Sequence, residues 1–201
     1  MKNGFRLRPL VAALLVAAPL AMPTTASAQN WMARLRAIDV APNVSSSVPG
    51  LSVDNVWTGE LDFTYFFTKN VAVELILATT KHNLNINGAS IGNVSVLPPT
   101  LTLQYHFTDL GAFKPYVGGG LNVTYFYNTD LSLGGKPLSI NSTSTGGALQ
   151  AGIDYEFAKN WVLNFDYKYI WISTPVNLGS TQVTNLQINP SVWGVGIGYR
   201  F

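Results

Sequence analysis

The last ten residues of the chain, 192–201, narrow the choice of fold more than any other segment. Every second side chain from Trp193 to Phe201 is large and apolar, and glycines occupy most positions between them. Successive side chains of a β-strand point to opposite sides, so this segment is a strand with one apolar face and one thin face. An unpaired apolar strand at the edge of a soluble sheet would promote aggregation. Closure into a barrel within lipid pairs the edge and covers the apolar face.

The same alternation recurs in seven earlier segments, which predicts eight strands of the length that crosses a membrane, about 9–11 residues. The expected strands are 31–40, 60–67, 71–78, 97–107, 115–127, 149–157, 161–171 and 192–201. Short turns are expected at 68–70, 108–114 and 158–160, and long loops at 41–55, 81–96, 128–143 and 173–185. Short and long connections therefore alternate. An even number of strands places both termini on the short-turn side, which would be the periplasm.

These patterns predict an all-β fold, an eight-stranded antiparallel transmembrane β-barrel with short periplasmic turns and longer extracellular loops. The alternative is a soluble lipocalin-like barrel or sandwich, whose apolar face would point inward and leave residues such as Glu74 and Asp154 outside. The aromatic residues argue for lipid. They gather near both ends of the expected strands, as in the two aromatic girdles of outer-membrane barrels.

The first 28 residues have the features of a cleaved signal peptide. A basic start with Lys2, Arg6 and Arg8 precedes a short apolar run, and residues 26–28 read Ala-Ser-Ala. We expect cleavage after Ala28, which leaves 29–201 as the barrel domain. The alternative, an N-terminal anchor helix, needs a longer apolar run.

Composition excludes several classes of function. The chain has no cysteine, and charged residues make up only 11%, well below the ~25% typical of soluble domains. Without the leader, nine basic residues face ten acidic ones, so no nucleic-acid partner is expected. No nucleophile elbow, metal-spaced cluster or phosphate loop is present. We expect no enzyme activity, cofactor or metal. A lipid-modifying enzyme would need a Ser or His arrangement near the outer rim, which we do not find.

Charged residues of inward parity gather in the periplasmic half of the expected barrel. Opposite charges in so narrow a lumen should pair, because a lone charge away from water is costly. We interpret this set as a charged floor that plugs the lumen. Its members are Arg34, Arg36, Glu74, His106, Asp154, Glu156 and Arg200.

Inward positions nearer the extracellular loops are apolar, and we expect them to line a chamber for a small hydrophobic molecule. They are Ile38, Val40, Ile76, Phe126, Ile170, Ile172 and Val192. A molecule that entered from outside could not pass the floor and would leave sideways. Proline cannot donate to a strand ladder, so Leu97, Pro98, Pro99 and Thr100 are expected to flank a lateral exit. Alternatively, these prolines only end strands.

Several motifs together resemble the OmpW family of small outer-membrane proteins, over nearly the whole mature chain. They are Arg34-x-Arg36-Ala37, Asn70-Val71-Ala72-Val73-Glu74-Leu75, Leu97-Pro98-Pro99-Thr100-Leu101, Pro115-Tyr116-Val117-Gly118-Gly119-Gly120-Leu121-Asn122 and the terminal Gly198-Tyr199-Arg200-Phe201. The resemblance implies an eight-stranded barrel in the outer membrane of a Gram-negative cell. It also implies a hydrophobic channel that moves small apolar compounds into the membrane with lateral release. The C-terminal aromatic, Phe201, would be part of the signal read by the outer-membrane assembly machinery.

One position differs from a purely apolar channel. Lys168 places a charge near the base of the expected chamber, with Asp166 or Glu60 as its expected partner, which argues against a wide passage. We therefore expect a monomer in outer-membrane lipid that takes up small hydrophobic compounds. The alternative is a structural, adhesion or receptor barrel of the OmpX type, with a filled lumen and extracellular loops that bind partners.

Overall fold

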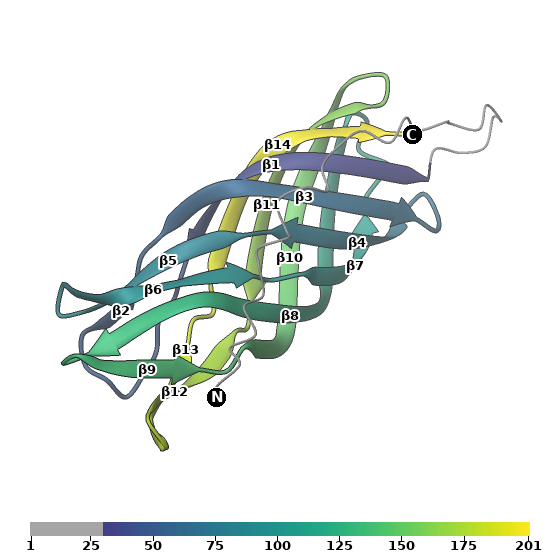
Figure 1. Ribbon diagram of the computed structural model, residues 1–201. Coiled ribbons are helices and arrows are strands. Elements are labelled where there is room, and N and C mark those ends of the chain that lie inside the picture. Colours follow the sequence, from purple (N-terminus) through teal and green to yellow (C-terminus); the bar gives the residue numbers. More distant parts are fainter. Residues whose placement is uncertain (1–29) are drawn as a thin grey trace, which may run out of the picture.

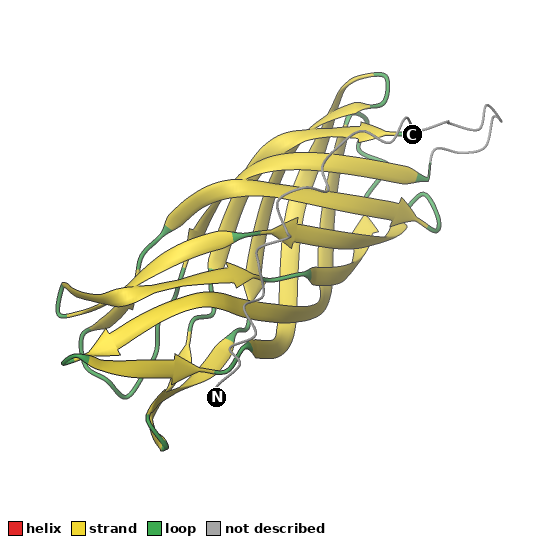
Figure 2. Ribbon diagram, viewed as in Figure 1, coloured by secondary structure: helices red, strands yellow, loops and turns green. Residues whose placement is uncertain are grey.

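The computed structural model describes residues 30–201, so the signal peptide predicted for 1–28 lies outside the described residues. Strands and the turns between them make up this part of the chain (Figure 2). Between residues 30 and 201, no helix is long and apolar enough to cross a membrane.

Eight strands close into an antiparallel barrel (Figure 1). In ring order they are β1 (Trp31–Ala41), β3 (Val56–Phe66), β4 (Val71–Ala78), β7 (Thr100–His106), β8 (Phe113–Leu133), β10 (Thr143–Ala158), β11 (Trp161–Ile170) and β14 (Ser191–Arg200). Strand β14 returns to β1 with Leu35 opposite Ile197. At the end of this ladder, Phe201 N–H donates to the Trp31 carbonyl over 2.8 Å. The predicted closure of the barrel by its last strand is confirmed.

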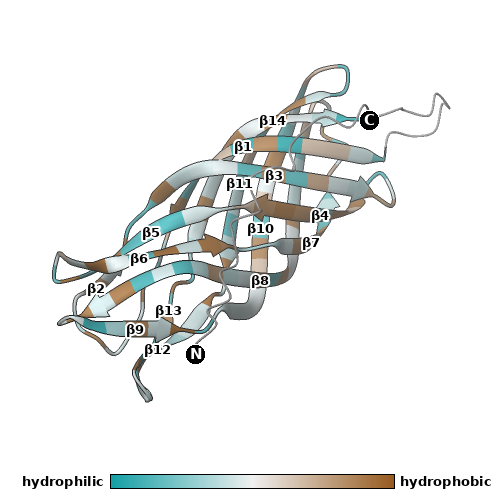
Figure 3. Cartoon of the chain, in the orientation of Figure 1, coloured by the Kyte–Doolittle hydropathy of each residue, from teal (hydrophilic) through white to brown (hydrophobic). Residues whose placement is uncertain are grey.

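The two faces of the barrel wall differ as the alternation predicts. Outward side chains are large and apolar, and many are about half exposed, including Leu35, Leu121 and Phe165. Inward positions of the same strands are buried. Brown and teal stretches are accordingly mixed along the barrel strands in Figure 3, because apolar outward residues alternate with polar inward ones. The outward apolar residues form a belt that matches the surface lipid covers in outer-membrane barrels.

The glycines of β14 make room for two arginines of the neighbouring strand. A Cβ added at Gly196 would clash with the Leu35 carbonyl oxygen and lie 2.8 Å from Arg36 Cγ, and one added at Gly198 would lie 2.8 Å from Arg34 Cγ. Both distances are shorter than side chains tolerate. The thin face of the last strand therefore lets long inward side chains of β1 fill the lumen.

The four long connections are present, but they are not irregular loops, because six further strands form within them. They are β2 (Leu51–Val53), β5 (Thr80–Ile86), β6 (Ala89–Leu97), β9 (Lys136–Ile140), β12 (Ser173–Leu178) and β13 (Thr181–Gln187). They lie at the end of the barrel opposite the C-terminus (Figure 1). Strands β6 and β9 both pair with the extended outer part of β8. A bridge between Ser45 and Gln187 joins β13 to the segment before β2. The barrel wall thus continues above the eight-stranded ring.

The interior has two hydrophobic clusters separated by polar side chains. The larger cluster lies in the upper barrel and its extension and includes Ile38, Phe126 and Leu186. The smaller one lies at the periplasmic end and consists of Met32, Phe66, Ala72 and Val162.

Candidate functional site: an apolar chamber above a charged plug

Arg34 lies at the centre of the lower lumen and binds three carboxylates. Its Nη1 lies 3.0 Å from Asp62 Oδ1 and 3.0 Å from Glu74 Oε1. Its Nε and Nη2 form a two-point contact with Asp154 at 3.2 and 2.8 Å. All four residues are buried. A fully paired guanidinium is the arrangement that makes such a burial tolerable.

Arg36 and Lys168 extend this network towards the chamber. Arg36 donates to Glu60 Oε1 over 2.7 Å and to Glu74 Oε1 over 2.9 Å. Lys168 Nζ donates to Glu60 over 2.8 Å and to Asp166 over 2.5 Å. Both partners expected for Lys168 are therefore present, and its ammonium is fully paired.

Neutral polar side chains complete the plug. Gln150 donates to Glu74 Oε2 over 2.7 Å and to Asp166 Oδ2 over 2.8 Å. His106 Nε2 lies 2.9 Å from Gln104 Oε1, and its ring stacks on Tyr116. The sequence pattern did not assign Gln104, Gln150 or Tyr116 to the network. His106 is a hydrogen-bonded member of the plug.

Two residues predicted for the charged floor lie at its edge. Glu156 is exposed, with Lys114 Nζ 4.0 Å away, so its assignment to the buried floor is wrong. Arg200 is half-buried, and its guanidinium lies 4.2 Å from the centre of the Phe66 ring. Both have inward parity, but they lie at the periplasmic mouth, where the lumen meets solvent. The remaining five, Arg34, Arg36, Glu74, His106 and Asp154, are buried in the lumen.

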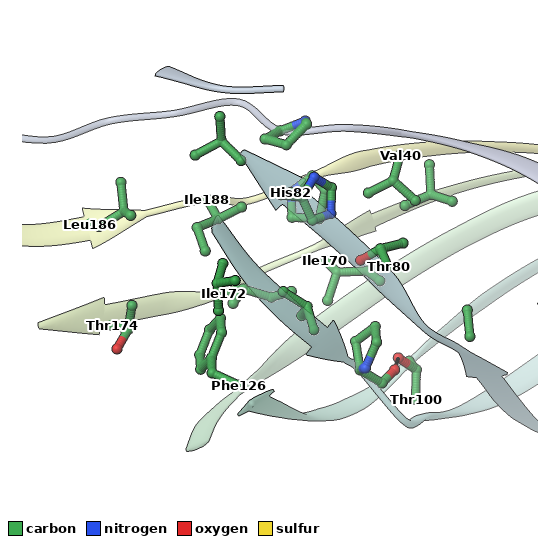
Figure 4. Close-up of a pocket in the computed structure, with 18 of the residues that line it drawn as sticks. Val40, Thr80, His82, Thr100, Phe126, Ile170, Ile172, Thr174, Leu186 and Ile188 are labelled. Carbon is green, nitrogen blue, oxygen red and sulfur yellow. Dashed lines mark hydrogen bonds between the residues drawn. The ribbon is translucent and has the colours of Figure 1, made fainter. Parts of the chain in front are cut away.

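All seven residues predicted for the chamber lie around one cavity in the upper barrel (Figure 4). Ile38, Ile76, Phe126 and Val192 belong to four different strands and are each at most 5% exposed. Glu60 and Lys168 form the lower end of this cavity. Its volume is about 60 Å³, several times the ~10–15 Å³ that one water needs. It is below the ~150 Å³ of a cavity that holds benzene, so an aromatic molecule enters only when the lining side chains move apart.

The extracellular extension contributes chamber residues that the sequence analysis missed. Leu84, Val94 and Leu131 line the same cavity from segments predicted as loops, and Leu186 lines it from β13. A signal was available for some of them, because the inward alternation of β4 continues through Thr80 and Leu84 into β5. The apolar lining therefore reaches beyond the eight-stranded ring towards the outside.

His82 is a second missed lining residue. Its side chain is buried, and Nδ1 donates to the Asp54 carbonyl over 2.8 Å. The outward neighbours Lys81 and Asn83 are polar and exposed, which places His82 above the lipid belt. Burial lowers the pKa of His82, and the bond to Asp54 partly opposes this shift. The neutral imidazole suits an apolar wall.

The wall beside the chamber contains a break at the two prolines. Strands β4 and β7 pair as far as Ile76 and Thr100, and β5 and β6 resume at Thr80 and Val96. Both pairs share one register, so residues 77–79 face 97–99. In the part of the chain that the structure describes, no strand pairing joins residues 77–79 to residues 97–99. We call this break the seam; Ala78 and Pro98 lie on its chamber side.

The chain is similar in sequence to known outer-membrane proteins. The chain matches the OmpW family over residues 25–201. It is 41% identical over 196 residues to the outer-membrane protein y4mB of Sinorhizobium fredii, covering 92% of this chain and 85% of that protein. It is 35% identical to outer membrane protein W of Escherichia coli, covering 84% of each chain. The chain belongs to the OmpW family.

The solved structures agree with this assignment. OprG from Pseudomonas aeruginosa superposes with a TM-score of 0.75 at 28% identity, covering 86% of this chain and 95% of that one. As a member of the OmpW family, the protein is an integral β-barrel of the outer membrane, and its apolar belt lies in lipid. The resemblance inferred from the sequence motifs is confirmed.

Proposed function

We propose that the protein takes small hydrophobic molecules from outside into the apolar chamber and releases them sideways into the outer membrane. The observation that carries the proposal is the position of the chamber. It lies below the apolar extension and above the plug of paired charges, with the seam at its side. No bond is made or broken in this process.

The plug supports a sideways route because it leaves no vertical one. Arg34, Asp62, Glu74 and Asp166 are fully buried across the lumen. The small apolar cluster of Met32, Phe66, Ala72 and Val162 packs below them. An apolar molecule that moved downward would have to break several paired charges at once, which is costly.

The seam supports the exit because few bonds need to break there. Pro98 and Pro99 have no N–H to donate. The outward residues Leu75 and Leu77 lie on the lower edge of the seam, in the apolar belt. A molecule that passed between Ala78 and Pro98 would therefore enter hydrocarbon directly.

Uptake of the apolar dye N-phenylnaphthylamine by Gram-negative cells tests this proposal. The dye fluoresces once it reaches phospholipid, and an intact lipopolysaccharide surface slows it. Cells that express the protein should take up the dye several-fold faster than matched cells without it. Ala78→Phe should return uptake to background, because the new ring fills the chamber beside the seam.

Ala33→Phe is the matched control, because it adds the same ring to an outward position of β1. It should leave uptake at the wild-type rate. Equal uptake by wild type and Ala78→Phe, at equal amounts of folded protein, would show that the chamber is not the route.

The last strand closes the barrel and bears on its assembly. The terminal strand carries Phe201, paired to Trp31 through both backbone bonds. We infer that the assembly machinery reads this strand and that the closed barrel works as a monomer in lipid.

A further inference from the structure

The seam is bridged on its lipid-facing side by one threonine. Thr79 lies between β4 and β5, and its Oγ1 donates to the Val96 carbonyl over 3.4 Å. The same oxygen lies 2.5 Å from the hydroxyl oxygen of Tyr127, which belongs to β8. Tyr127 pairs with Ser95 of β6, so the contact crosses over β6. Thr79 therefore ties the β4–β5 edge to strands on the far side of the seam.

A second set of bonds fixes the proline segment to β8. Asn122 Nδ2 lies 3.2 Å from the carbonyl oxygens of Pro98 and Pro99 and 2.9 Å from Thr100 Oγ1. The Val123 N–H donates to the Pro99 carbonyl over 3.0 Å. Pro98 and Pro99 are thus bonded to β8, whereas Thr100 also pairs with Ile76 of β4. Any opening of the seam moves the β4–β5 edge, the edge that Thr79 secures.

We propose that Thr79 and Tyr127 form a clasp that holds the seam closed and sets the rate of lateral release. This inference rests on the proposed function and names the contact that controls it. Both side chains are exposed on the outer wall, between the apolar belt at Leu77 and the polar position Lys81. The clasp therefore lies where the hydrocarbon of the outer leaflet meets its headgroups. Its hydroxyl pair can open and re-form without disturbing the chamber lining.

Two variants remove the clasp while keeping side-chain shape, Tyr127→Phe and Thr79→Val. Each should raise the rate of dye uptake about three- to tenfold, the range expected for the loss of one hydrogen bond. The double variant should match the single ones, because both changes remove the same contact. Tyr125→Phe is the matched control. Tyr125 is an exposed tyrosine two residues earlier in β8 that makes no side-chain hydrogen bond within the described structure, and its variant should behave as wild type.

Binding separates the clasp from a general loosening of the barrel. Fluorine NMR of 1-fluoronaphthalene with the protein in lipid nanodiscs should give the wild-type affinity for both clasp variants. Their unfolding midpoints in urea should stay close to that of Tyr125→Phe. Uptake at the wild-type rate in both clasp variants would overturn the clasp. Wild-type uptake above background in the same experiment would leave the proposed function standing.

A reversible cross-link tests the seam itself. The chain has no cysteine, and the register shared by β4–β7 and β5–β6 places Thr79 opposite Leu97. Oxidised Thr79→Cys/Leu97→Cys should lose uptake, and reduction should raise uptake to the rate of Thr79→Val, because the reduced pair lacks the clasp threonine. Ala37→Cys/Val195→Cys joins register partners on β1 and β14 and should transport in both states. Uptake by the oxidised seam pair equal to that of its reduced form would contradict release through the seam, and with it the clasp.

Discussion

Arg34 shows how individual residues stabilise the plug. Its guanidinium pairs with Asp62, Glu74 and Asp154 in a region without solvent access. In such a setting an ion pair adds little net stability over apolar packing, but the loss of one partner leaves the others buried and uncompensated. The network therefore behaves as a unit.

Arg34→Met should lower the free energy of unfolding by about 3–5 kcal/mol, because three carboxylates lose a shared cation. Urea unfolding of the protein in lipid vesicles, followed by tryptophan fluorescence, measures this loss. Lys69→Met is the control, because Lys69 forms an exposed pair with Asp109 at 3.6 Å and should leave stability unchanged. Similar losses in both variants would show that the plug network is not selectively important.

At the scale of elements, the β5–β6 hairpin converts a barrel rim into a chamber wall. It contributes His82, Leu84, Val94 and Val96 to the lining, whereas the eight-stranded ring closes without it. Folding of the barrel and formation of the chamber thus depend on different segments of the chain.

Replacement of residues 82–94 by a short Asn-Gly turn should leave a folded barrel that no longer binds apolar molecules. The shortened chain should keep its strand signal in circular dichroism, and its affinity for 1-fluoronaphthalene should fall at least tenfold. A shortened barrel that binds with the wild-type affinity would show that the hairpin is not part of the site.

The same elements show how far the sequence could predict the structure. The eight ring strands were predictable because one face contacts lipid and the other fills the lumen, which imposes a strict alternation. The hairpins were missed although their turn signals are present. Asn87 and Gly88 both have positive φ, the conformation that favours Asn-Gly in two-residue hairpin turns. Their outward residues are largely polar, such as Lys81 and Asn83, and they lack the apolar outward face by which the ring strands were recognised.

Site residues were predictable where the alternation of inward and outward positions along a strand is enough to place them in the lumen. Ile38, Ile76 and Val192 follow from parity and approximate height on a strand. Near the periplasmic mouth, the position of a residue along its strand does not predict whether it is buried. Glu156 shows this, because inward parity does not reveal where the lumen meets solvent. The seam contacts of Thr79 with Tyr127 were not predictable, since they join residues that strand register alone does not place opposite each other.

The whole molecule divides its lumen into a closed lower half and an apolar upper half. The lower half holds paired charges and a small apolar seal, and the upper half holds the chamber. The extension lengthens the chamber away from the membrane, and the seam lies in the wall between the chamber and the outer surface. In the proposed function, an apolar molecule enters from outside and leaves through the seam.

The position of a bound heavy-atom ligand tests this account most directly. Crystals of the protein soaked with 1-bromonaphthalene should show an anomalous bromine peak inside the chamber, between Phe126, Ile170 and Pro98. Bromine found only on the lipid-facing surface, with the chamber vacant at saturating ligand, would contradict the central claim that the upper lumen is the binding site.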